Sequence, residues 1–174
     1  GRSTASRSAV SDTNHTAFGS GASAWCANCH TDMANDSLTT MHPIGNLRST
    51  IAGNYGEYVS TNGVTGDPAT SYWEAVPFET NQAIADLDIG STAGPTSASK
   101  VMCMTCHRAH ASAFPDAGRW DFAATLLVMD SHPQAGDGNA MSWDVANKYY
   151  DRDYVGGVDE FAQRSLCNKC HKQD

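Results

Sequence analysis

A five-residue pattern, Cys-x-x-Cys-His, occurs three times in this chain and constrains its fold more than any other feature. The copies occupy residues 26–30, 103–107 and 167–171. Two thiols at this spacing lie on one helical turn, where they can bond to the two vinyl groups of one porphyrin, and the histidine that follows can ligate its iron. The sequence therefore predicts three covalently bound haem c groups. The predicted thioether residues are Cys26, Cys29, Cys103, Cys106, Cys167 and Cys170, and the predicted proximal iron ligands are His30, His107 and His171.

The same cysteine pairs are also compatible with a zinc site or with a disulfide framework in a secreted chain. Neither alternative requires a histidine directly after each pair. With 7 histidines among 174 residues, chance would place a histidine after all three pairs on the order of once in ten thousand cases. Haem attachment is therefore favoured. It uses all six cysteines, which leaves none for a disulfide or a catalytic thiol.

The composition suits a chain that folds around cofactors. Hydrophobic residues make up 40% of the chain, aromatic residues make up 9%, and the mean hydropathy is -0.42. Side chains alone would form a thin core, and three porphyrins would add the missing apolar surface. We expect a multihaem cytochrome c fold that is mostly loop, with short α-helices wrapped around a haem stack and little or no β-structure. Residues 25–174 are expected to form this triheme core, and residues 1–24 a polar N-terminal tail.

The charge and the hydropathy pattern exclude two classes of partner. The formal net charge is -8, and haem propionates and ferric irons would bring it to about -11 in the oxidised protein. Nucleic acid is therefore not an expected partner, because phosphates would be repelled. The longest strongly apolar run covers residues 123–129, whereas a membrane helix needs about 20 residues, so no membrane span is expected.

The start of the chain bears on localisation. Residues 1–11 contain no apolar run of the signal-peptide type. Because c-type haem is attached outside the cytoplasm, we expect an exported, mature chain from which the signal peptide has already been removed.

Four histidines remain after the proximal ligands are assigned, and they are candidates for the distal iron positions. They are His15, His42, His110 and His132. This number suffices to give every iron two imidazole ligands, whereas a haem enzyme must keep one iron open or weakly ligated. We therefore expect an electron-transfer protein and not an enzyme. Methionine is the competing distal ligand, and Met102 and Met104 lie beside the second motif.

His110 is the most informative of these four histidines. It follows His107 by three residues, so both imidazoles should leave one helical turn on neighbouring faces. The thioether bonds hold that turn against the proximal side of its own haem, so His110 must serve a different haem. His42 precedes Pro43, which favours extended backbone and a ligand presented from a loop.

Periodicity and capping signals predict only short elements elsewhere. A short helix is expected within residues 48–60, Ser71 and Glu74 form a capping-box pattern, and residues 80–100 are expected to be loop. Residues 120–129 could form either a buried helix or a strand. Two further helices are expected over residues 142–150 and 159–172, the second of which would carry the last motif.

Several segments, taken together, resemble one family much more specifically than the bare motifs do. They are residues 25–32, with the sequence Trp-Cys-Ala-Asn-Cys-His-Thr-Asp, and residues 42–45, 51–53, 77–79, 103–112 and 166–171. Over residues 25–174, in order, the chain resembles the extracellular cytochrome nanowires of the OmcS and OmcE type. The match is to the last three haems of those larger proteins.

The resemblance implies a subunit that polymerises head to tail into a helical filament and carries electrons out of the cell. Its partners would be copies of itself, redox partner cytochromes and extracellular acceptors such as metal oxides, and its location would be extracellular or at the cell surface. The alternative that shares every haem residue is a soluble periplasmic or cell-surface triheme electron shuttle.

In that family one haem takes its distal histidine from the neighbouring subunit, through a segment N-terminal to the shared core. His15 is the only histidine before Trp25, so it is the candidate for this donated ligand. The distal ligands implied are therefore His42, His110 and His15, with His132 as a weaker candidate.

Overall fold

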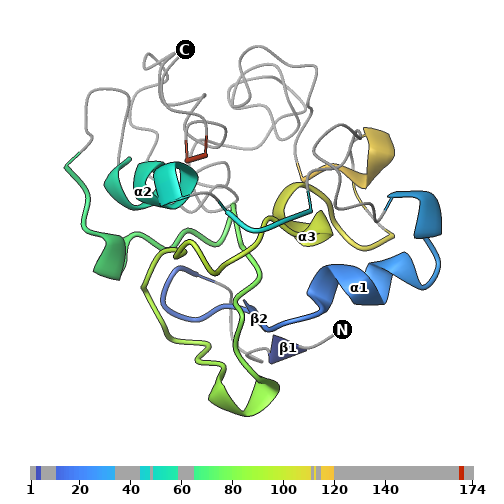
Figure 1. Ribbon diagram of the computed structural model, residues 1–174, viewed down its shortest axis with the longest axis horizontal. Helices are drawn as coiled ribbons and strands as arrows, with labels where there is room; N and C mark the ends of the chain where they lie inside the picture. Colours follow the sequence, from blue (N-terminus) through green and yellow to red (C-terminus); the bar gives the residue numbers. More distant parts are fainter. Residues whose placement is uncertain are drawn as a thin grey trace, which may run out of the picture.

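The computed structural model describes residues 3–4, 11–33, 44–47, 49–58, 65–110, 112, 115–119 and 169–170. Within these residues most of the chain is loop, as the sequence predicts (Figure 1). The regular elements are strands β1 (Ser3–Thr4) and β2 (Ala17–Phe18) and helices α1 (Ala22–Ala27), α2 (Ser49–Glu57) and α3 (Cys103–Cys106). Single turns of 3-10 helix are η1 (Thr31–Met33), η2 (Pro68–Thr70), η3 (Ile84–Asp86) and η4 (Pro115–Ala117).

The β-structure consists of very short pairings. β1 and β2 pair antiparallel, with Thr4 opposite Ala17. Single bridges then continue from Phe18 to Glu79, from Glu79 to Lys100, and from Lys100 to Asn46. Strands this short have little stability of their own. They nevertheless tie together segments that are far apart in the sequence.

α2 confirms the expected helix within residues 48–60. Its buried face includes Ala52 and Tyr55, and Gly56 lies on the same side. A Cβ atom at Gly56 would come within 2.9 Å of the Pro68 ring, so the glycine allows η2 to pack directly on α2. The interior glycine that weakens this helix in isolation is thus a packing requirement.

A nine-residue stretch, Ser71–Glu79, forms the middle of the core, and we call it the central segment. All of its residues except Glu74 are buried, and Trp73 is 0% exposed. In Figure 1 it passes between α2 on one side and α1 and α3 on the other. The Tyr55 hydroxyl donates to the Val76 carbonyl at 2.8 Å and accepts from the Trp73 amide at 3.0 Å, which fastens α2 to it.

The capping-box prediction at Ser71 and Glu74 is wrong. No helix begins at Ser71, which instead ends η2 and donates its hydroxyl to the Pro68 carbonyl. The capping residue of that turn is Asp67, whose carboxylate accepts from the Ala69 amide at 2.8 Å. Burial of the following residues in the core outweighs the local helix signal. The expectation of loop over residues 80–100 is confirmed, apart from η3.

Residues 11–24, which belong to the expected N-terminal tail, pack on the rest of the chain. The His15 amide donates to the Ile89 carbonyl at 2.9 Å, and the Thr80 amide donates to the Phe18 carbonyl at 2.8 Å. β2 and α1 follow directly, so the tail leads into the first motif as part of the folded core.

Several sequence predictions lie outside the described residues. They concern Cys167, His171, His42 and His132, the segment 120–129 and the helices expected over residues 142–150 and 159–172. Among the helices that the structure does describe, none has the length and apolar character needed to cross a bilayer.

Candidate haem-attachment sites

The first motif lies at the end of α1. The amides of Cys29 and His30 both donate to the Cys26 carbonyl, at 3.1 and 3.0 Å, so the motif turns tightly around its first cysteine. Cys26 is half-buried, whereas Cys29 and His30 are exposed. The local geometry therefore places both thiols and the imidazole on one turn, where a single bound group could contact all three.

The second motif coincides with α3, which is a single helical turn. The Met102 amide donates to the Thr105 hydroxyl at 3.1 Å, and that hydroxyl donates to the Pro77 carbonyl at 2.7 Å. Thr105 is buried and lies between the two cysteines of the motif. One side chain thus caps the turn and fixes it to the central segment.

A hydrogen bond from one ring nitrogen of His107 orients the ring so that the other nitrogen could bind a metal. Its Nδ1–H donates to the Asp116 carbonyl at 2.7 Å, so Nε2 is the ring nitrogen that would bind a metal, in the arrangement usual for such histidines. Asp116 and Ala117 have φ angles of +56° and +53°. This left-handed backbone is uncommon for residues with a side chain and often occurs at functional sites.

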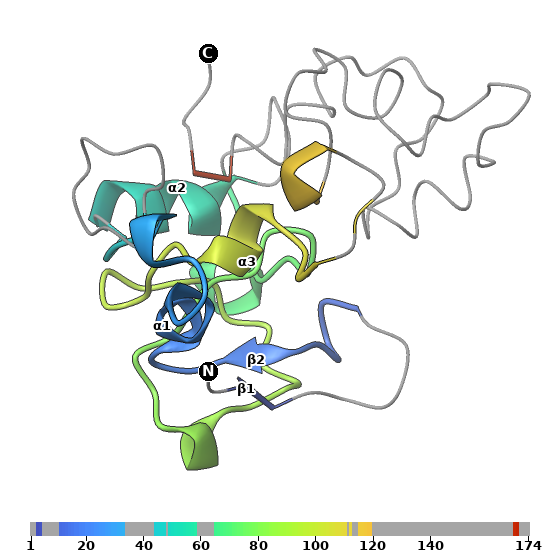
Figure 2. The same cartoon turned by 90° about the vertical axis from the view of Figure 1, so that its right-hand side faces the viewer.

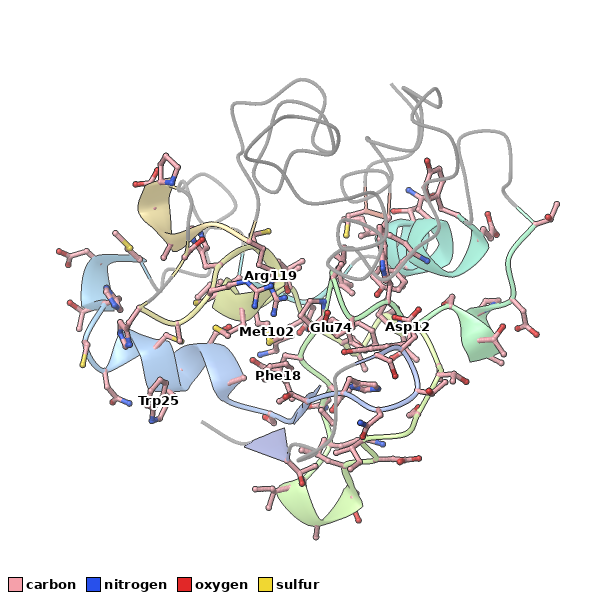
Figure 3. The ribbon with its side chains drawn as sticks, turned by 180° about the vertical axis from the view of Figure 1, so that it is seen from behind. Asp12, Phe18, Trp25, Glu74, Met102 and Arg119 are labelled. Carbon is pink, nitrogen blue, oxygen red and sulfur yellow. The ribbon has the colours of Figure 1, made fainter. Side chains whose placement is uncertain are left out.

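Arg119 forms hydrogen bonds to the backbone of the same motif. It is buried, its Nε donates to the Met104 carbonyl at 2.6 Å, and its amide donates to the Cys106 carbonyl at 2.8 Å. Its guanidinium also lies 3.9 Å from the Glu74 carboxylate, and Figure 3 shows these groups close together near Met102. The sequence contains no pattern that singles out this arginine.

The first two motifs lie next to each other. α1 and α3 are adjacent in both views (Figures 1 and 2), and the Cys103 amide donates to the Ser23 hydroxyl at 3.3 Å. Burial, followed by the neighbouring Cys103 thiol, raises the pKa of Cys26. Groups attached at these two cysteines would therefore be neighbours.

His30 and His110 come together although 80 residues separate them in the sequence. Their ring centroids are 6.3 Å apart, with an angle of 30° between the ring planes. His110 has a φ of +57°, a left-handed conformation that histidine tolerates better than most residues. If two imidazoles bind one metal ion from opposite sides with metal–nitrogen distances of about 2.0–2.1 Å, their centroids lie roughly 6.3 Å apart. The observed spacing fits two axial ligands of one haem iron.

His15 is held inside its own chain. Its ring stacks on Tyr72 with a centroid distance of 3.7 Å and an interplanar angle of 18°. Its Nε2–H donates to the Ser91 carbonyl at 2.9 Å, and its buried Nδ1 has no hydrogen-bond partner. The sequence predicts an accessible ligand arm, but only 3% of His15 is exposed. A donated ligand would have to leave Tyr72 and Ser91 first.

Two residues of the third motif, Lys169 and Cys170, are described. Lys169 is 1% exposed, and its ammonium group donates to the carbonyls of Tyr55 and Ser71 at 2.9 and 3.1 Å. It also lies 4.5 Å from the centroid of the Tyr55 ring. Lysines are rarely buried, so sequence reasoning missed this residue. It fastens the third motif to α2 and to the central segment.

Replacing Lys169 with Met is expected to lower the free energy of unfolding by about 1–3 kcal/mol, because two buried carbonyls lose a charged donor. Thermal unfolding of the haem-loaded chain measures the change. Lys100→Met is the matched control, because Lys100 is only half-buried. Equal melting temperatures for Lys169→Met and the control would contradict a structural role for the buried ammonium.

No disulfide joins any of the five cysteines that the structure describes. Among the described residues, no three or more His, Cys, Asp or Glu side chains gather as they would in a zinc site.

No family model matches the chain. It is 34% identical to the C-type cytochrome OmcS of Geobacter sulfurreducens over an alignment of 197 positions, gaps included, which covers 99% of this chain and 44% of OmcS.

Two solved structures of that protein also match. The outer membrane cytochrome S filament is 33% identical, with a TM-score of 0.72, over 99% of this chain and 48% of the other. The OmcS nanowire structure is 31% identical, with a TM-score of 0.70, over 99% and 46%. The chain thus spans about half the length of its relatives.

The fold and the paired motifs are those of a multihaem c-type cytochrome. The similarity extends over nearly the whole chain in both sequence and structure. The chain belongs to the OmcS-type family, which confirms the resemblance seen in the sequence.

Proposed function

We propose that this chain is a triheme c-type cytochrome that assembles head to tail into an extracellular, electron-conducting filament. The observation that carries the electron-transfer part is the 6.3 Å spacing of the His30 and His110 rings, which suits an iron closed by two imidazoles. The filament part rests on similarity over 99% of the chain to structures described as an OmcS filament and as OmcS nanowires.

Each haem c supplies a reversible one-electron exchange when it is bound. The residues of this chain hold and orient it. Cys26 and Cys29 provide the thioether bonds of the first group, and His30 and His110 are its axial ligands. This pairing supports the geometric argument that His110 serves a haem other than the one attached at its own motif.

The second group is held by Cys103, Cys106 and His107, and the third by Cys167, Cys170 and His171. The hydrogen bond from His107 Nδ1 to the Asp116 carbonyl keeps the ring orientation that Nε2 ligation needs. The distal ligands of these two groups come from His42 and His15, with His132 as the weaker candidate.

Irons with two protein ligands leave no open position for a substrate, so the chain is an electron carrier and not an enzyme. Its partners are copies of itself, redox partner cytochromes and extracellular acceptors such as metal oxides, at the cell surface or beyond it. A soluble triheme shuttle uses the same haem residues and differs only in remaining unassembled.

The haem content and the assembly are both measurable. Because thioether bonds survive unfolding, the intact mass of the denatured chain should exceed that of the polypeptide by three haem equivalents. Electron micrographs of the purified protein should show filaments. A mass increase of two haems or fewer contradicts the triheme assignment, and three haems in a purely monomeric protein would favour the shuttle.

A further inference from the structure

The central segment, Ser71–Glu79, contacts the helix that carries the first motif. One oxygen of the Glu79 carboxylate accepts from the Gly21 amide at 2.9 Å, and the other accepts from the Ser23 amide at 3.1 Å. These are amides at the start of α1, which the helix itself leaves unpaired. Glu79 therefore positions the start of the helix that ends in the first attachment site.

The same segment contacts the other two motifs through its backbone. The Pro77 carbonyl accepts from the Thr105 hydroxyl of the second motif at 2.7 Å. The Ser71 carbonyl accepts from the Lys169 ammonium of the third motif at 3.1 Å. Nine consecutive residues thus hold one anchor point for each of the three motifs.

The first two anchor points are linked to each other. The Cys103 amide donates to the hydroxyl of Ser23, the residue whose amide binds Glu79. Hydrogen bonds therefore run from Glu79 through Ser23 to Cys103, and from Thr105 back to Pro77. Because this path closes on itself, α1 cannot shift relative to α3 without breaking at least one of these hydrogen bonds.

The central segment is itself firmly held. Glu79 is 2% exposed, its amide donates to the Lys100 carbonyl at 3.0 Å, and the Lys100 amide donates back at 2.8 Å. A buried carboxylate is costly unless it is well hydrogen-bonded, and both oxygens of Glu79 have amide donors. Charge-assisted bonds of this kind are stronger than neutral ones.

We propose that the central segment is a brace that sets the spacing between the haem groups, with Glu79 as its main positioning residue. The inference rests on the triheme assignment made above. Functional groups work best when packed and hydrogen-bonded neighbours hold them to within about 0.5 Å. Electron exchange between cofactors depends steeply on their separation, so this brace would determine how well adjacent groups are coupled.

The test is Glu79→Gln in the haem-loaded protein. An amide has one acceptor oxygen where the carboxylate has two, so one of the two α1 amides loses its partner while the side-chain shape is kept. The readout is circular dichroism in the Soret band, where neighbouring haems give a paired signal whose size depends on their separation and orientation. We expect three haems by mass, low-spin irons and a weaker paired signal.

Glu57→Gln is the matched control, because Glu57 is exposed at the end of α2, and it should leave the paired signal unchanged. Ser23→Ala is a milder second variant that removes only the acceptor of the Cys103 amide. It should also weaken the signal, whereas Ser20→Ala, at an exposed position, should not.

The outcomes separate the two proposals. Three haems per chain with an unaltered paired signal in both Glu79→Gln and Ser23→Ala would overturn the brace and leave the triheme assignment standing. Fewer than three haems in the unmodified protein would overturn the triheme assignment. The proposal that the central segment braces three haems would then fail as well.

Discussion

Replacing His110 with Ala is expected to open one iron position on the haem attached at Cys26 and Cys29. The reason is the 6.3 Å spacing of the His30 and His110 rings, which suits the proposal that both imidazoles bind that iron. The variant should keep three haems, turn one iron high-spin and bind carbon monoxide. The unmodified protein should contain no high-spin iron and should not bind carbon monoxide. Electron paramagnetic resonance and carbon monoxide difference spectra measure these changes.

Two further variants sharpen the test of His110. Ala109→Ser changes an exposed neighbouring residue and should leave every iron low-spin. His110→Met should restore a six-coordinate iron with a raised potential, because a thioether ligand raises the potential relative to imidazole. Removing Cys26 and Cys29 together with His110 should abolish the carbon monoxide signal. If that signal persists, the vacancy lies on another haem and the geometric argument is refuted.

Replacing His15 with Ala is expected to leave three haems per chain but to give short filaments or none. If His15 ligates an iron of the neighbouring subunit, its loss leaves one iron per subunit high-spin or bound by water. A heterologous contact that repeats without closing builds a filament, so removing a ligand from that contact should stop growth. Electron microscopy measures filament length, and paramagnetic resonance measures the spin state.

His15 also packs in the core of its own subunit, so His15→Phe is needed as a control that separates packing from iron binding. Phenylalanine keeps an aromatic ring against Tyr72 but has no nitrogen to bind iron. The alanine variant should also lose about 1–3 kcal/mol of unfolding free energy from the stack and the bond to Ser91, and the phenylalanine variant less. Normal filaments with six-coordinate irons in His15→Phe would make His15 a core residue. His132 would then be the first candidate for the donated ligand.

The sequence alone determined the attachment motifs and their local geometry. Cys26, Cys29 and His30 lie on one turn, and Cys103–Cys106 is a helical turn of its own, because three-residue spacing and main-chain hydrogen bonds act within a few residues. The helix at residues 49–57 was predictable for the same reason, since apolar residues recur there at helical spacing. The family was also recognisable from short segments that keep their order along the chain.

Only the tertiary structure decided which side chains hold the motifs together. Glu79, Thr105, Lys169 and Arg119 each bind a main-chain group of a different segment, and the contact from Lys169 to Tyr55 spans 114 positions. Nothing in the sequence around them has a period or a spacing that signals such a role. Contacts with segments distant in sequence also explain why His15 is buried and why the capping-box prediction at Ser71 failed. A polar group finds its partner among segments that are near in space and distant in sequence, so the folded chain, and not the local pattern, decides which hydrogen bonds form.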